Sequence, residues 1–409
     1  MNFPYPFLIA FRYFRSKKKH SGISINTLIS VAGVALGVMT LLTVLAVMSG
    51  FQDDLQKKIL GANAHVIVQS YDGNIRDHES VREKINGIRG VTASSPVVYG
   101  QVMLRSGSRA SGVVVRGIDP VIELQTTDIL NKLKAGSIDN LKEGDGTPGI
   151  IVGKELLRNL GLFVGDEIEM ISPLGEMGPL GMIPKMRKFR VAGFFEAGMF
   201  EYDSSLAFIN IGVAQKFLGL NDAVTAIEIK LTDPYLAEEV AGTVGGLLGI
   251  PYIARDWMQM NRNLFSALKL EKIVMFIILT LIILVASFNI ISNLIMTVIE
   301  KSREIAIIKA MGATGRGIMS VFMIHGLIIG ITGTAVGVLG GYALCQVLKT
   351  YKFINLPADV YYLSYLPVKM DPFDFITVPA AAILISFLAT VYPSWQAARL
   401  DPVESLRYE

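Results

Sequence analysis

The stretch Gly149-Ile-Ile-Val-Gly153-Lys154-Glu155 is the part of the sequence that comes nearest to a phosphate-binding loop. A Walker loop needs four residues between its glycines and a Ser or Thr after the lysine, because that hydroxyl holds magnesium. Here three residues separate the glycines, and Glu155 follows the lysine. The chain is therefore not predicted to bind ATP, magnesium or another cofactor itself.

Other reactive side chains do not form a recognisable site either. The single cysteine, Cys345, excludes a disulfide within the chain. No nucleophile, base and orienting group recur at a recognisable spacing, and the formal charge of +3 comes without a basic patch for nucleic acid. None of the histidines begins a His-x-x-x-His metal pair: His20, His65, His78 and His325. We therefore predict no catalytic residue, no metal site and no enzyme activity.

A short charged segment at residues 300–316 is a candidate for transmitting force from a partner protein. Its residues Ile305, Ile308 and Met311 share one helical face, charges occupy the other, and Gly312 can stop the helix. Such a helix could be gripped by a soluble motor protein, whereas a solvated connector is the alternative. The residues predicted to couple are Glu300, Arg303, Glu304, Ile305, Ile308, Lys309, Met311 and Gly312.

A proline- and glycine-rich run at residues 172–184 is a candidate for partner binding. Its three prolines and three glycines exclude a long helix and a central strand, so the run must form an extended or hooked excursion. Its apolar side chains favour a docking element, although packing against its own domain is the alternative. The predicted contact residues are Pro173, Leu174, Met177, Pro179, Leu180, Met182, Ile183 and Pro184.

The elements that must position these two segments are mostly apolar helices. The chain is 51% hydrophobic and 18% charged, with a mean hydropathy of +0.47, which is typical of a membrane protein. Four stretches are long enough to cross a hydrocarbon core of about 20 helical residues. We predict the spans at residues 25–52, 271–299, 317–348 and 375–396, and the first is too long for a cleaved signal.

Basic residues set the predicted orientation. Five lie at positions 12–19 and four at 301–316, which places both ends of the chain in the cytoplasm. Residues 1–24 then form a cytoplasmic interfacial helix, residues 300–316 a cytoplasmic coupling helix, and residues 397–409 a cytoplasmic tail. Residues 53–270 form a large outer domain, and residues 349–374 an outer loop.

The outer domain is predicted to be α+β. Alternating strands and helices indicate a split part at residues 60–130 and 221–256, with a β-rich insertion at 149–220 that carries the hook loop 172–186. Apolar stripes continue the first and second spans outward as stalks: Met48, Phe51, Leu55 and Ile59, then Trp257, Met260, Leu264 and Leu268. If residues 256–299 form one helix, it is about 66 Å long. Four spans seldom enclose a pathway alone, so two copies or two related chains are expected to face each other.

At this point two motifs carry a resemblance. Residues 300–313 and the ending Tyr392-Pro-Ser-Trp-Gln-Ala-Ala-Arg-Leu-Asp-Pro-Val-Glu-Ser-Leu-Arg-Tyr408 resemble the MacB/FtsX-type ABC permeases. The start Phe7-Leu-Ile-Ala-Phe-Arg-Tyr-Phe14, the run Val47-Met-Ser-Gly-Phe51 and the run Leu356-Pro-Ala-Asp-Val-Tyr-Tyr-Leu-Ser-Tyr-Leu-Pro367 look like the LolC/LolE family of lipoprotein-releasing permeases. The proline-rich run falls where LolC carries its hook.

The resemblance spans essentially the whole chain and implies a function. It implies an inner-membrane permease with a periplasmic α+β domain between its first and second spans, powered by a separate LolD-like ATPase dimer that binds ATP and magnesium. It further implies a lipoprotein substrate, contacts with membrane lipids, and a LolA-like periplasmic chaperone that binds the hook. Residues expected to contact lipoprotein or lipid are Met48, Phe51, Leu55, Met260, Leu264, Leu268 and Tyr362.

Three alternatives stay open at this stage. The hook resembles LolC while residues 359–367 look more like LolE, so a hybrid permease acting as a homodimer competes with a heterodimer of sister permeases. A MacB-like efflux permease is a second alternative, although such proteins usually carry a fused ATPase domain. An FtsX-like signalling permease is a third, although its outer domain is normally much shorter.

Overall fold

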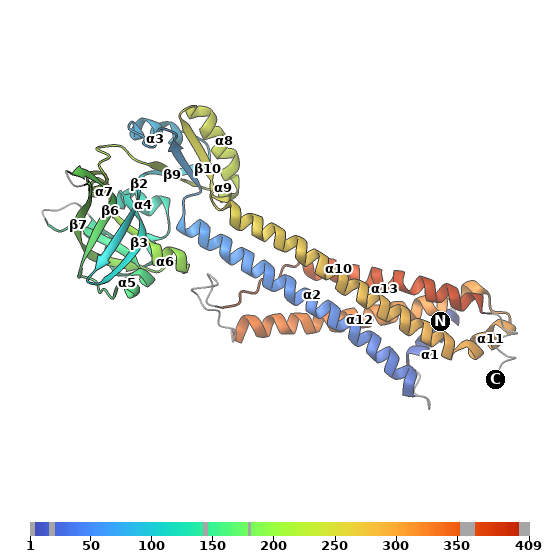
Figure 1. Cartoon of the computed structure of the whole chain (residues 1–409). Helices are drawn as coiled ribbons and strands as arrows, with labels where there is room; N and C mark the ends of the chain where they lie inside the picture. The colour runs from blue at the N-terminus through green and yellow to red at the C-terminus, as the bar shows by residue number, and fades with distance from the viewer. Residues whose placement is uncertain (1–4, 16–20, 142–145, 179–180, 352–364, 401–409) are drawn as a thin grey trace. The chain divides into compact units, whose positions relative to one another are not determined.

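The structure of the chain, a computed structural model, describes residues 5–15, 21–141, 146–178, 181–351 and 365–400 (Figure 1). It divides into two units. The described residues of the helical unit lie within Met1–Asp53, Ala267–Ile354 and Leu366–Glu409, and those of the mixed unit lie within Asp54–Ser266, with Tyr365. The two boundaries at Asp53 and Ser266 fall within long helices, so each of these helices contributes residues to both units.

The helical unit is built from long helices that lie side by side (Figure 1). The long helices are α2 (Ser21–Ala62), α10 (Arg262–Glu300), α12 (Gly315–Tyr351) and α13 (Asp374–Arg399). The shorter ones are α1 (Tyr5–Arg15) and α11 (Ser302–Ala310). Among the described residues, three helices are long and apolar enough to cross a membrane: Thr27–Ala62, Gly315–Tyr351 and Asp374–Arg399. A fourth candidate is the pair Leu284–Glu300 and Ser302–Ala310, which bends by 61°. The predicted count of four spans therefore stays a prediction.

Small residues let α12 pack closely against its neighbours. A Cβ atom added at Gly326 or Gly330 would lie 2.0 or 2.6 Å from side-chain atoms of Thr390 or Ser386 in α13. A Cβ at Gly337 would lie 2.7 Å from the backbone oxygen of Ala35 in α2. Small residues at such spacing allow helix backbones to approach in lipid. The glycines of α12 therefore serve packing within the chain.

The mixed unit contains one ten-stranded sheet in the described residues. Its strand order is β10-β1-β9-β2-β3-β8-β5-β7-β4, and β6 pairs with β2 and β7. Most neighbours are antiparallel, whereas β3 with β8 and β5 with β7 are parallel. The strands are β1 (Val66–Ser70), β2 (Val91–Ser106), β3 (Arg109–Ile118), β4 (Leu133–Gly136), β5 (Gly149–Gly153), β6 (Glu167–Gly178), β7 (Gly181–Phe195), β8 (Leu206–Asn210), β9 (Ala226–Leu231) and β10 (Tyr252–Asp256).

Short helices join and cover these strands. They are α3 (His78–Asn86), α4 (Pro120–Thr126), α5 (Lys154–Leu160), α6 (Phe200–Ser205), α7 (Ile211–Leu218), α8 (Ala237–Leu248) and α9 (Trp257–Met260), with 3-10 turns at Leu130–Lys132, Ile138–Leu141 and Pro234–Leu236. An apolar core includes Phe195 and Phe208, whose rings meet edge to face at 5.4 Å. The α+β class agrees with the sequence prediction.

Two features of the mixed unit differ from the expectation. Residues 149–220 do not form a sheet of their own, because β8 pairs with β3 and β6 pairs with β2. The division into a split part and a β-rich insertion therefore stays a prediction. Residues 256–299 are not one helix either: Asp256 caps the short helix α9, which ends at Met260, and Asn261 separates it from α10.

Candidate functional site

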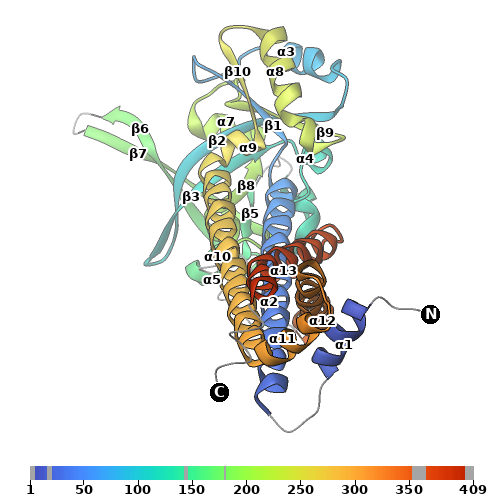
Figure 2. The same ribbon diagram turned by 90° about the vertical axis from the view of Figure 1, so that its right-hand side faces the viewer.

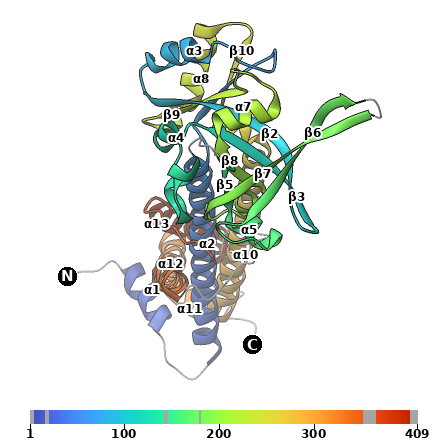
Figure 3. The same ribbon diagram turned by 90° about the vertical axis from the view of Figure 1, so that its left-hand side faces the viewer.

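The proline- and glycine-rich run forms the end of a two-stranded arm. Strands β6 and β7 pair from Glu167 with Arg190 out to Gly178 with Gly181. Beyond Ser172 and Lys185, which are partners in register, the described residues of these strands pair only with each other. Figures 2 and 3 show the arm standing off from the rest of the sheet. This geometry agrees with a hooked excursion.

The base of the arm is held to the sheet by charge. The Arg105 guanidinium on β2 donates to the Glu169 carboxylate on β6, with Nη2 2.5 Å from Oε2. The hydrogen bond and charge of Arg105 lower the pKa of the Glu169 carboxyl. The pairing of β6 with β7 shifts register between Ser172 and Glu176, where Pro173 cannot donate to the ladder. The arm therefore leaves the sheet at a defined point.

The predicted hook residues are only partly visible. Pro173 and Pro184 are exposed near the base of the arm. The backbone of Leu174, Met177, Met182 and Ile183 belongs to the arm. Pro179 and Leu180 lie outside the described residues. The docking role of this set stays a prediction.

The predicted coupling helix exists as α11, and it ends where expected. It stops at Ala310, and Gly312 follows in the left-handed region with φ +99°. Its apolar face, however, points inward: Ile305 is 1% exposed and belongs to the core of the helical unit, and Ile308 packs against that core. Ile305 and Ile308 are therefore turned toward the helical unit and not toward a partner.

The outward side of α11 is mixed in character. Arg303 and Glu304 are exposed, and so are Ile307 and Met311, the latter at 75%. Glu300, which ends α10, is also exposed. This surface combines charge with flexible apolar side chains, which suits a protein contact.

Lys309 joins α11 to the end of another helix. Its Nζ donates to the backbone oxygens of Ala398 at 3.0 Å and Leu400 at 2.6 Å, at the carboxyl end of α13. A cation at this end of a helix donates to carbonyls that lack a partner in the helix, and it interacts favourably with the negative end of the helix dipole. The sequence placed Lys309 among the partner contacts, but in this structure its ammonium is used within the chain.

The predicted lipid-contact residues are not equally accessible. Met48, Phe51, Met260, Leu264 and Leu268 are partly exposed. Leu55 is only 1% exposed, so it offers no surface to a lipid here. Trp257, part of the same predicted stripe, is fully buried and donates from Nε1 to the oxygen of Pro234 at 2.9 Å. Tyr362 lies outside the described residues, and contact of these residues with lipoprotein stays a prediction.

A buried ionic cluster in the mixed unit escaped the sequence analysis. The Arg116 guanidinium on β3 donates to Glu123 on α4 at 2.9 Å and to Glu228 on β9 at 2.6 Å. The Tyr99 hydroxyl on β2 donates to Glu228 as well, and Thr127 donates to Glu123 at 2.7 Å. Burial raises the pKa of the Glu228 carboxyl to about 7, although Arg116 pulls it down. The residues are far apart in sequence, so no spacing could reveal them.

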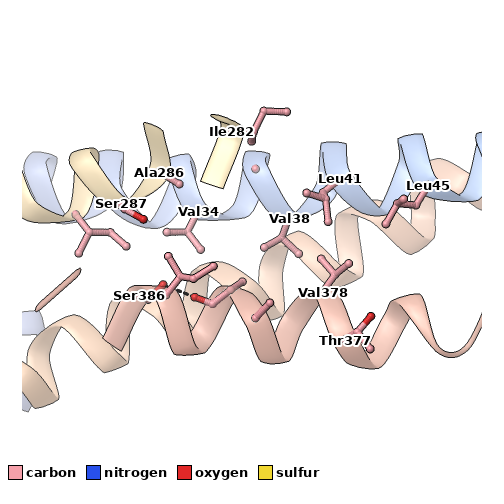
Figure 4. Close-up of a pocket in the computed structure, with 15 residues that line it drawn as sticks. Val34, Val38, Leu41, Leu45, Ile282, Ala286, Ser287, Thr377, Val378 and Ser386 are labelled. Carbon is pink, nitrogen blue, oxygen red and sulfur yellow. Dashed lines mark hydrogen bonds between the residues drawn. The ribbon is translucent and has the colours of Figure 1, made fainter. Parts of the chain in front are cut away.

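A second missed feature lies in the helical unit. Fifteen residues of α2, α10 and α13 line a cavity of about 350 Å³ (Figure 4). Figure 4 shows Val34, Val38 and Leu41 of α2 facing Val378 and Ser386 of α13. The lining carries no charged side chain. Hydropathy marks these helices as apolar but does not show where they leave space.

Comparison with known proteins identifies two matching domain families and several full-length relatives. The MacB-like periplasmic core domain matches residues 27–246, and the FtsX-like permease C-terminal domain matches residues 276–402. The chain is 39% identical to the lipoprotein-releasing system transmembrane protein LolC of Xylella fastidiosa, over 99% of either chain. It is 28% identical to LolE of Haemophilus influenzae, over 98% of this chain and 99% of that one, and 29% identical to LolC of the same organism over the full length of both.

Proposed function

The chain belongs to the LolC/LolE family of lipoprotein-releasing system transmembrane proteins, and on that premise we propose that it is the permease subunit of an ABC transporter for lipoproteins. It sits in the bacterial inner membrane with both ends in the cytoplasm and the mixed unit in the periplasm. It takes lipoproteins from the outer leaflet and passes them to a LolA-like chaperone. The full-length relation to LolC carries this proposal, because it covers both units and not one shared domain.

The energy comes from a separate LolD-like ATPase, since no phosphate-binding loop occurs in the sequence. That ATPase contacts the outward side of α11, formed by Arg303, Glu304, Ile307 and Met311. The buried Ile305 and the Lys309 bonds to α13 support force transfer from this surface into the helical unit. Helices α2 and α10 contribute residues to both units and so provide continuous connections to the mixed unit.

A second permease chain completes the transporter. Along α10 a run of apolar side chains is exposed: Leu270, Ile273, Val274, Ile277, Ile278, Leu281, Leu284, Val285 and Phe288. In water such a surface would be a large apolar patch, which supports contact with lipid or with another permease. LolC and LolE of Haemophilus influenzae are 29% and 28% identical to the chain, so either a copy of this chain or a sister permease can fill the second position.

The arm is the element that recruits the chaperone. Its outer half pairs with no other strand among the described residues and carries the apolar run between Pro173 and Pro184. An exposed hairpin of this kind can present apolar side chains to a partner without disturbing its own sheet.

The test replaces residues 173–184 with Asn-Gly. Because Ser172 and Lys185 already face each other in register, a two-residue turn joins them without strain. We expect chaperone capture and lipoprotein transfer to fall to background, while ATPase activity of the reconstituted complex stays within about twofold. The control replaces the turn Gly107–Ser108 between β2 and β3 with Asn-Gly, which should leave transfer intact. Normal transfer by the arm variant would contradict the docking role.

A further inference from the structure

The cavity lined by α2, α10 and α13 (Figure 4) is a groove with the dimensions of a single hydrocarbon chain. Along α2 it runs from Val34 to Leu45, which is about 16 Å at the helical rise per residue. That is about half of a hydrocarbon core of roughly 30 Å, or one leaflet. The groove, with a volume of about 350 Å³, therefore suits one flexible hydrocarbon chain.

Small side chains keep the groove open. Gly37 lies in the α2 wall, and a Cβ added there would meet its nearest atom, in Ile282 of α10, only at 4.0 Å. Ala381 and Ala382 line the α13 wall, and Ala286 lines the α10 wall. The space is thus a property of three helices that pack around it.

The hydroxyl groups of α13 do not select a polar ligand. Thr377 donates from Oγ1 to the backbone oxygen of Phe373 at 3.0 Å, and Ser386 donates from Oγ to that of Ala382 at 2.7 Å. Both hydroxyls are satisfied within their own helix. A peptide would leave its amides without partners in such a groove, whereas a hydrocarbon chain loses nothing.

A charged pair lies beyond one end of the groove. Leu45 precedes Ala46, whose backbone oxygen accepts from the Lys369 amide at 2.9 Å. The Lys369 ammonium lies 2.5 Å from the Asp53 carboxylate, and its side chain is half exposed. The backbone of Pro367 crosses α2 at Gly50, where a Cβ would lie 2.6 Å from the Pro367 oxygen. An amphipathic molecule in the groove would place its polar end beside Lys369.

We propose that this groove binds one acyl chain of a membrane glycerophospholipid, with the headgroup beside Lys369 and Asp53. The proposal rests on the proposed function only for the presence of a surrounding bilayer. Bilayer phospholipid is present in large excess over any lipoprotein, so mass action favours it as the occupant. The lipid stays bound between α2, α10 and α13 as a structural component. It is distinct from the lipoprotein that is transported.

The test uses a phosphatidylethanolamine that carries a diazirine in the middle of its palmitoyl chain. The full complex is reconstituted in bilayer nanodiscs with this lipid, irradiated and mapped by peptide mass spectrometry, without ATP or lipoprotein. We expect adducts concentrated on the groove segments of α2 and α13. Adducts spread evenly over the exposed faces of α10 and α13 would overturn the proposal.

Two filling variants and one matched control sharpen the result. Ala382→Phe and Gly37→Leu fill the groove from opposite walls, and each should lower adduct yield there by about tenfold, because two buried methylenes are worth that much in binding. Leu384→Phe changes an exposed position of α13 and should leave the yield unchanged. Unchanged adducts in both filling variants would overturn the proposal.

A competition experiment shows which molecule supplies the acyl chain in the groove. A triacylated lipopeptide added in excess should leave the phospholipid adducts in place. If it removes them, the occupant is the cargo and the proposal is wrong. The crosslinking needs no transport, so a failed release assay leaves this result untouched.

Discussion

Arg116 holds one positive charge between two buried carboxylates, Glu123 and Glu228. If both carboxylates ionise, one negative charge stays uncompensated in a region without solvent, which is costly. The Tyr99 hydroxyl and the Phe208 ring, whose centroid lies 5.2 Å from the guanidinium, cannot neutralise it. The cluster is therefore most stable when Glu228 keeps its proton.

This balance predicts a pH dependence. The pKa of Glu228 is raised to about 7 from an ordinary 4.5, so its stabilising effect is complete below about pH 4.5 and is lost as the pH rises through 7. At about 1.4 kcal/mol per unit, the maximum change is about 3 kcal/mol. Glu228→Gln removes this titration. We expect the stability advantage of the natural protein over Glu228→Gln to shrink by that order between pH 5 and 8.

The measurement follows denaturant unfolding of the detergent-solubilised chain by Trp257 fluorescence. Trp257 is buried in the mixed unit, and Trp395→Phe removes the other tryptophan. Parallel pH profiles for the two proteins would contradict the charge balance described above.

At the scale of elements, α11 is anchored at two points. Ile305 lies in the core of the helical unit, and Lys309 binds the carbonyls at the end of α13. A displacement of α11 therefore moves α13 with it, provided that both attachments hold. We expect ATP hydrolysis and transport to be linked at this joint between α11 and α13.

Removal of the Lys309 charge should uncouple the two activities. With Lys309→Met, we expect ATP hydrolysis within about twofold of normal and lipoprotein transfer per ATP lowered by about tenfold, because bonds from a charged donor contribute about 1.5–3 kcal/mol each. Lys309→Arg should restore much of the yield, because it keeps the charge. Lys301→Met removes a cation that lies at the start of α11 and pairs with Glu304 of that helix, and it serves as the control. Equal transfer per ATP in Lys309→Met and this control would rule out the joint.

The sequence predicted where helices lie along the chain better than it predicted which neighbours they pack against. Hydropathy placed the ends of α12 and α13 within three residues, and Gly312 indicated where α11 stops. The apolar stripe of α11 was recognised, but a stripe does not show which neighbour covers it, and Ile305 proved to face the core. The break at Asn261 was missed because Asp256 caps a separate short helix there.

At the scale of the whole molecule, what the sequence could not show depends on contacts between distant residues. The parallel pairing of β3 with β8 joins residues near 114 to residues near 206, and it merges the predicted insertion into one sheet. The Arg116 cluster unites four elements in the same way. The groove depends on how α2, α10 and α13 pack, which no local pattern encodes.

The central claim is that this chain moves lipoproteins with energy supplied by a separate ATPase. The most direct measurement reconstitutes the chain in proteoliposomes with lipoprotein, with or without its ATPase partner, and counts the lipoprotein recovered on soluble chaperone after ATP is added. We expect transfer only when ATPase and ATP are both present. Transfer by the chain alone, or no transfer by the complete complex, would contradict it.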